Sequence, residues 1–155
     1  MAKKAPEVAS DTYEKFCKTI KVYDLTTEAL SYKRTGYPSD DSTLKMKIFG
    51  KASDCKFTYD GSGFLVIKIP LGFKVNKANK DGKTKREIIF DMKVVYNLIC
   101  QTEIKMDNET LERFAEEHLP LLFFPYFREL IHCSLVKAGL PPLMVPFMEI
   151  KGKGN

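Results

Sequence analysis

A strict alternation of side chains from Phe90 to Gln101 constrains the fold more than any other feature of the sequence. The apolar members of the alternation are Phe90, Met92, Val94, Tyr96, Leu98 and Cys100. Most of the residues between them are polar. A period of two residues is that of a β-strand, whose successive side chains point to opposite faces. The stretch therefore predicts a strand with one buried face, which a second layer of structure must cover.

Three further segments are predicted to be strands. The first lies around Lys21, within a segment (residues 14–33) that favours extended structure over helix. The second is an alternation of apolar residues with lysines: Leu44, Lys45, Met46, Lys47 and Ile48. The third is the apolar run Phe64–Ile69, which follows a turn at Asp60–Gly63 and is expected to end at Pro70. Four strands with hairpin-like connections predict an antiparallel sheet.

The sequence after residue 105 has the spacing of helices. Asp107 or Asn108 can cap a first helix, which Pro120 interrupts. A second helix is predicted from apolar residues at helical spacing: Phe123, Phe124, Phe127, Leu130, Ile131 and Leu135. Gly139 and the prolines after it end this helix, and an extended apolar segment follows. Strands followed by helices predict an α+β fold.

The length of 155 residues suits one hydrophobic core. We expect a disordered segment at residues 1–12, a single domain at 13–151 and a short tail at 152–155. The sequence shows no apolar stretch of the roughly 20 residues that cross a bilayer, and no apolar region follows the basic residues near Met1. These features predict a cytoplasmic protein that does not insert into membranes.

The net charge of +5 permits a nucleic-acid partner, but the positions of the charges matter more than their sum. Six basic residues crowd one polar segment: Lys74, Lys77, Lys80, Lys83, Lys85 and Arg86. No aromatic side chains are interleaved with them, so a solvated loop is the preferred interpretation and nucleic-acid binding a distant alternative.

The sequence shows no recognisable pattern of catalytic or metal-binding residues. The cysteines are far apart, at positions Cys17, Cys55, Cys100 and Cys133, and only His118 and His132 could assist them. Neither zinc-ligand spacing nor a nucleotide-binding or hydrolase motif is present. We expect no enzyme activity, no metal and no cofactor.

The segment Leu119–Ile150 resembles the signature region of the SecB export chaperones, in which a helix with an LFPY-ARE pattern precedes a short loop, a proline and an apolar extended run. The positions that match are Phe124, Pro125, Tyr126, Arg128, Glu129, Gly139, Pro141, Leu143 and Pro146. The resemblance implies a twisted four-stranded antiparallel sheet with helices packed on one face, assembled as a dimer of dimers. It also implies a chaperone that holds non-native polypeptide in an apolar surface groove, without ATP.

Two sets of residues are candidates for these roles. The client groove is expected between the terminal apolar run and aromatic residues of the sheet: Leu143, Met144, Val145, Phe147 and Met148 on one side, Phe57 and Tyr59 on the other. The alternative role of the terminal run is to cover the core. An apolar stripe too wide for one core-facing side predicts a contact with another subunit through Tyr126, Leu130, Cys133 and Leu135.

The sequence departs from the SecB pattern in two ways. It ends near the point where the export chaperones begin a further helix and an acidic tail, and it is basic where they are acidic. The outward face of the predicted second strand carries Lys45 and Lys47, which argues against docking of the export motor ATPase. A specialised SecB-like chaperone that protects an antitoxin is therefore an equal candidate, and an adaptor for one folded partner is the alternative function.

Overall fold

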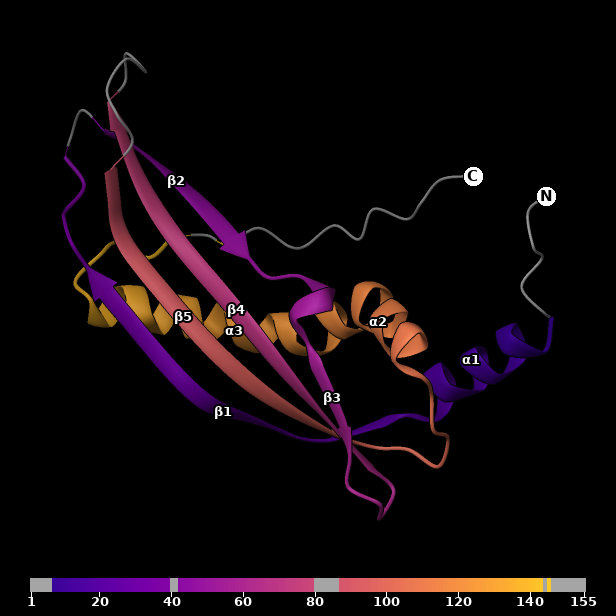
Figure 1. Ribbon diagram of the computed structural model, residues 1–155. Coiled ribbons are helices and arrows are strands. Elements are labelled where there is room, and N and C mark those ends of the chain that lie inside the picture. Colours follow the sequence, from indigo (N-terminus) through magenta and orange to yellow (C-terminus); the bar gives the residue numbers. More distant parts are fainter. Residues whose placement is uncertain (1–6, 40–41, 80–86, 144, 146–155) are drawn as a thin grey trace, which may run out of the picture.

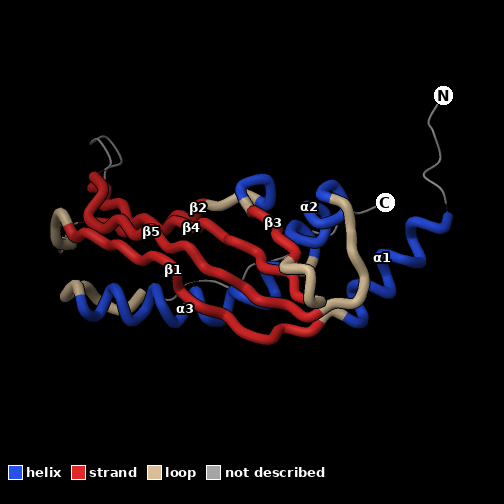
Figure 2. Tube along the Cα trace, turned by 60° about the horizontal axis from the view of Figure 1, so that its bottom comes forward, coloured by secondary structure: helices blue, strands red, loops and turns tan. Residues whose placement is uncertain are grey.

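The computed structural model describes residues 7–39, 42–79, 87–143 and 145. The elements are α1 (Glu7–Thr19), β1 (Lys21–Arg34), β2 (Ser42–Phe49), the short 3-10 helix η1 (Ala52–Asp54), β3 (Lys56–Tyr59), β4 (Phe64–Asn79), β5 (Glu87–Gln101), α2 (Asn108–Glu117) and α3 (Leu119–Lys137). Five antiparallel strands form one sheet, and α3 runs along one face of it (Figures 1 and 2). The predicted α+β class is confirmed.

The strands follow the order β1-β5-β4-β2 across the sheet, and β3 also pairs with β4. β2 pairs with residues 72–79 of β4 and β3 pairs with residues 65–68, while β5 occupies the opposite edge of β4. β2 and β3 therefore form one outer strand, which the 3-10 helix η1 interrupts in the middle. The four predicted strand positions are present, and the interruption makes the strands five.

The expectation that a strand would end at Pro70 is wrong, because β4 continues to Asn79. Proline lacks the backbone N–H that a sheet ladder requires. Pro70 lies between the residues of β4 that pair with β2 and those that pair with β3. No strand occupies that position on the outer edge, so a missing donor there leaves no ladder bond unmade.

The alternation along β5 is confirmed by its burial. Its apolar side chains from Phe90 to Cys100 are buried, and the residues between them are half-buried or exposed. β4 continues this buried face, since Leu65, Ile67 and Phe73 are also buried. The buried side chains of β4 and β5 form the apolar face of the sheet on which the helices pack.

The boundaries of α2 and α3 follow the predicted signals. The Asp107 carboxylate accepts a hydrogen bond from the Thr110 backbone N–H at 2.7 Å, which caps α2. α2 ends before Pro120, and that proline lies in the first turn of α3, where it is tolerated. Gly139 follows the end of α3 with a φ of 72°, a left-handed conformation that favours glycine.

Helix α1 corrects two expectations. Residues 7–12 are helical instead of disordered, and residues 14–19 are helical instead of extended. The helix is held by Tyr13 and Phe16, which are buried. The ring of Phe16 lies edge to face with Phe114 at 5.2 Å, and the Tyr13 hydroxyl donates to the Glu117 carboxylate at 2.9 Å. Contacts with α2, about a hundred residues away, thus stabilise a helix whose own sequence is mixed.

Helix α3 has the length and composition of a membrane-spanning helix, which contradicts the expectation that no such stretch exists. Core helices of soluble proteins can have the same length and apolar composition. One side of α3 is buried against the sheet, with Phe127 edge to face with Tyr96 of β5 at 6.5 Å. We interpret α3 as the core helix of this two-layer fold.

Candidate functional site

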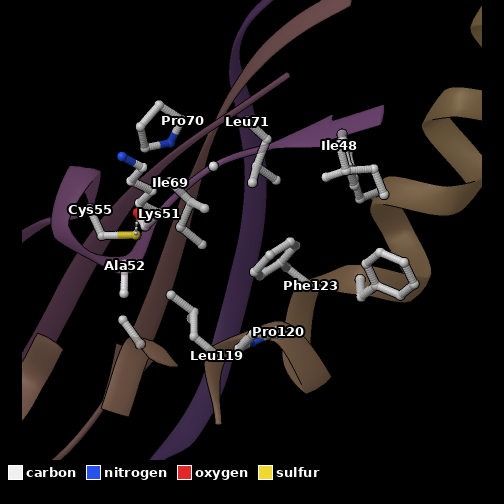
Figure 3. Close-up of a pocket in the computed structure, with 14 residues that line it drawn as sticks. Ile48, Lys51, Ala52, Cys55, Ile69, Pro70, Leu71, Leu119, Pro120 and Phe123 are labelled. Carbon is white, nitrogen blue, oxygen red and sulfur yellow. Dashed lines mark hydrogen bonds between the residues drawn. The ribbon is translucent and has the colours of Figure 1, made fainter. Parts of the chain in front are cut away.

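An apolar cleft lies where the outer strand is interrupted, between the sheet and the helices (Figure 3). The end of β2 and the crossover to β3 contribute Ile48, Gly50, Lys51, Ala52 and Cys55, and β4 contributes Ile69, Pro70 and Leu71. The helices contribute Ala115, Leu119, Pro120, Phe123, Phe124 and Phe127. The cleft measures about 90 Å³, which suits one apolar side chain.

The chain leaves the sheet at Gly50, and the shape of the cleft depends on this residue. Its φ of 154° is one that other residues rarely adopt, and a Cβ added there would lie 2.7 Å from Leu71 Cδ2. Leu71 is itself a wall of the cleft. Any larger residue at position 50 would therefore displace Leu71 and alter the opening.

The chemistry of the cleft is that of binding by burial. Its polar side chains are those of Lys51 and Cys55. Burial raises the pKa of the Cys55 thiol to about 11, so the thiol is protonated at neutral pH and is a poor nucleophile. The remaining walls are aliphatic and aromatic. The cleft can therefore accept apolar side chains.

The structure describes four of the residues that were predicted to form the client groove: Phe57, Tyr59, Leu143 and Val145. Phe57 and Tyr59 are half-buried on β3, where the Tyr59 hydroxyl accepts a hydrogen bond from the Met106 backbone N–H at 2.9 Å. Neither of them lines the cleft. Leu143 is half-buried against the core and Val145 is 5% exposed. The other members of the terminal run, Met144, Phe147 and Met148, lie outside the described residues.

The residues that do line the cleft could be found in part from the sequence. Ile48 belongs to the predicted alternation of β2, and the three phenylalanines belong to the predicted second helix. Ala52 and Leu71 carry no recognisable signal. They were missed because the interruption of the outer strand and the passage of β4 through Pro70 were not predicted.

The residues predicted at the subunit contact fall into two groups. Tyr126, Leu130 and Cys133 lie together on the outer side of α3, and with Leu25 of β1 they line a shallow hollow of about 290 Å³. Leu135 is fully buried in the core of its own chain and is withdrawn from this set. Leu135 follows Ile131 by four residues, and Ile131 follows Phe127 by four, so all three share the side of α3 that faces the sheet.

The candidate metal ligands and the clustered basic residues are described only in part. No group of three or more His, Cys, Asp or Glu side chains in the described part of the chain could hold a metal ion. Of the six clustered basic residues, Lys80, Lys83, Lys85 and Arg86 lie outside the described residues. The other two approach carboxylates of β5, with Lys74 at 3.7 Å from Asp91 and Lys77 at 3.6 Å from Glu87.

The fold is that of the SecB-like chaperones. A search of solved structures finds the Mycobacterium tuberculosis SecB-like chaperone Rv1957, in complex with a ChAD peptide from the HigA1 antitoxin, Rv1956. The match has a TM-score of 0.69 and covers 90% of this chain and 97% of that one, at 12% sequence identity. No family model matches the sequence, and no curated protein does. The predicted resemblance is thus confirmed by the fold.

Proposed function

We propose that this protein is a chaperone that holds non-native polypeptide, without ATP and without catalysis, by taking apolar side chains into the cleft between Gly50 and α3. The observation that carries the proposal is an open apolar cleft at the interruption of the outer strand, on a SecB-like fold. Aromatic and aliphatic walls accept many sequences, since apolar burial is not directional.

Burial of one side chain in this cleft cannot by itself give a client micromolar affinity. A fully buried apolar side chain contributes about 1.5–3 kcal/mol, whereas a micromolar complex needs about 8 kcal/mol after ordering costs. A client must therefore fill several subsites. Leu143 packs against the core near the end of the described chain, and we propose that the terminal run Leu143–Met148 supplies further subsites together with Phe57 and Tyr59.

Assembly would multiply these subsites. β1 is an edge strand, and all but one of its residues are exposed. The outer side of α3 beside it carries Tyr126, which is 57% exposed, with Leu130 and Cys133. An unpaired strand edge next to an apolar helix face favours pairing with a second copy, so we propose a homodimer or a dimer of dimers through this face.

A dedicated partner is the second possibility for the same cleft. It is favoured by the structural neighbour, which binds a peptide from one antitoxin. In that case the protein would act as an adaptor for one segment, in the cytoplasm, in place of a general holder of export clients. The two possibilities differ in the breadth of sequences bound.

The proposal is tested by binding of a reduced, carboxymethylated and therefore permanently unfolded protein, measured by fluorescence anisotropy without nucleotide. Leu71→Ser should weaken binding by about tenfold, because it removes an apolar wall of the cleft. The matched control is Ile99→Ser, a half-buried aliphatic residue of the same sheet that does not line the cleft. Equal affinities for the two variants would reject the cleft as the client site.

A further inference from the structure

The outward face of the sheet, opposite the helices, carries a concentration of positive charge at its β2 edge. We define the lysine shelf as Lys45 and Lys47 of β2, Lys74 of β4 and Lys93 of β5, together with Phe49. Register places these side chains in adjacent rows of the sheet: Lys47 lies opposite Lys74, and Phe49 and Lys93 flank Gly72. Lys45, Lys47 and Lys93 are exposed.

The shelf is electrostatically unbalanced. Asp91 lies 3.7 Å from Lys74, and within the described chain no carboxylate comes within 4 Å of Lys45, Lys47 or Lys93. Like charges directly opposite each other across a ladder are destabilising, and Lys47 faces Lys74 in this way. The arrangement therefore costs folding stability and gains no internal ion pair at three of its four lysines.

An apolar side chain is exposed among these charges. Phe49 is 37% exposed, and the Lys47 and Lys74 ammonium groups lie 4.9 Å and 5.2 Å from the centre of its ring. Gly72 opposite it has no side chain, and a Cβ added there would lie 3.7 Å from Phe49 Cδ2, so the ring lies close to the glycine backbone. A ligand for the shelf should thus combine negative charge with an apolar group.

The edge of β2 determines the form of that ligand. β2 ends the strand order β1-β5-β4-β2, so its outer backbone edge has no partner strand among the described residues. An extended peptide can add to such an edge through backbone hydrogen bonds, with every second side chain on one face. Those side chains would lie beside Lys45, Lys47 and Phe49, which also occupy alternate positions of their strand.

We propose that the lysine shelf docks an acidic peptide segment that adds as a strand to β2, with two carboxylates at alternate positions beside Lys45 and Lys47 and an apolar residue beside Phe49. A peptide is favoured over nucleic acid by the surroundings of the ring. Proteins that hold single strands stack bases on open aromatic faces, whereas this shelf has one ring that two ammonium groups already approach. The shelf and the client cleft lie on opposite faces of the sheet, so the two sites are independent.

The test uses a fluorescein-labelled peptide with glutamates at two alternate positions and leucine two residues further, and its glutamine counterpart as the neutral control. Changing Lys45, Lys47 and Lys93 to glutamine should weaken binding of the acidic peptide by about tenfold. Lys74 is left in place because it is paired with Asp91. A control with the same change in net charge replaces the exposed residues Lys15, Lys18 and Lys137 by glutamine, and it should change the affinity by less than about twofold.

A second variant separates the proposed site from general attraction of charge. Phe49→Ser keeps every lysine and should abolish the preference for leucine over serine in the peptide. The proposal is overturned by equal loss of affinity in the two triple variants, by equal binding of the neutral peptide, or by shelf-dependent binding of an oligothymidylate in place of the peptide. It is also overturned if the shelf variant sediments differently, since the shelf would then join copies of the chain. Retention of unfolded client by the shelf triple variant is expected, because the cleft is untouched.

Discussion

The client cleft can be tested by filling it. Ala52 lies in η1, half-buried, and Figure 3 places it across the cleft from Leu119. Ala52→Leu adds three carbon atoms at a site whose free space is about 90 Å³. The new side chain should occupy the volume that a client side chain would take, without removing any residue from the core.

The expected changes in binding and in stability have opposite signs. Loss of one buried apolar side chain of the client costs about 1.5–3 kcal/mol, so the dissociation constant should rise by a factor of about 10–150. If the three added carbons fit, burial of their apolar surface contributes about 2 kcal/mol to the free energy of unfolding. The free energy of unfolding should therefore stay the same or rise, whereas a mutation that merely damages the fold would lower it.

Two measurements on the same sample decide the matter: anisotropy with the permanently unfolded protein, and urea denaturation followed by circular dichroism. Ala78→Leu is the matched control, because Ala78 is a half-buried residue of β4 that receives the same side chain and does not line the cleft. Unchanged client affinity in Ala52→Leu, with the fold intact, would refute the assignment of the cleft. Weaker binding accompanied by a loss of stability would refute the reasoning about free space.

Three further predictions concern assembly, folding and pH. Leu130→Asp should convert the proposed oligomer to monomers in sedimentation, because it places a charge in the apolar contact. Cys133 should resist alkylation in the native protein and react in that variant. A monomeric wild type would contradict the proposed interface. Phe16→Ala should lower the free energy of unfolding by about 3–5 kcal/mol in urea denaturation, because Phe16 is fully buried, and no loss would mean that α1 does not pack on α2. The hydrogen bond from Arg113, with that from Tyr13, lowers the pKa of Glu117, so its contribution to stability is complete above about pH 4.3 and is lost as the pH falls through the lower folded-state pKa. Denaturation curves of Glu117→Gln should accordingly differ from wild type at neutral pH and converge with it in acid, and a constant difference would count against the pair.

Local patterns in the sequence were sufficient for the elements whose signals are short-range. The alternation of β5 needs only the period of a strand, and its burial matches residue by residue. The Asp107 cap, the break before Pro120 and the left-handed Gly139 each depend on the conformation of a few neighbouring residues. The strand–helix order and the pattern of the α3 segment were also enough to predict the SecB-like fold, which the structural match confirms at an identity where sequence comparison finds no relative.

Features that depend on distant contacts were decided by the tertiary structure. α1 exists because Tyr13 and Phe16 meet residues of α2, and no local signal reveals that partner. Helical spacing places Leu135 on the same side of α3 as Phe127 and Ile131, but only the packing of that side on the sheet assigns Leu135 to the core instead of a subunit contact. Pro70 can lie inside β4 because the outer strand is interrupted beside it, and the same interruption opens the cleft at Ala52 and Leu71. The position of that gap depends on how β2 and β3 share one edge of β4, a pairing that only the folded chain specifies.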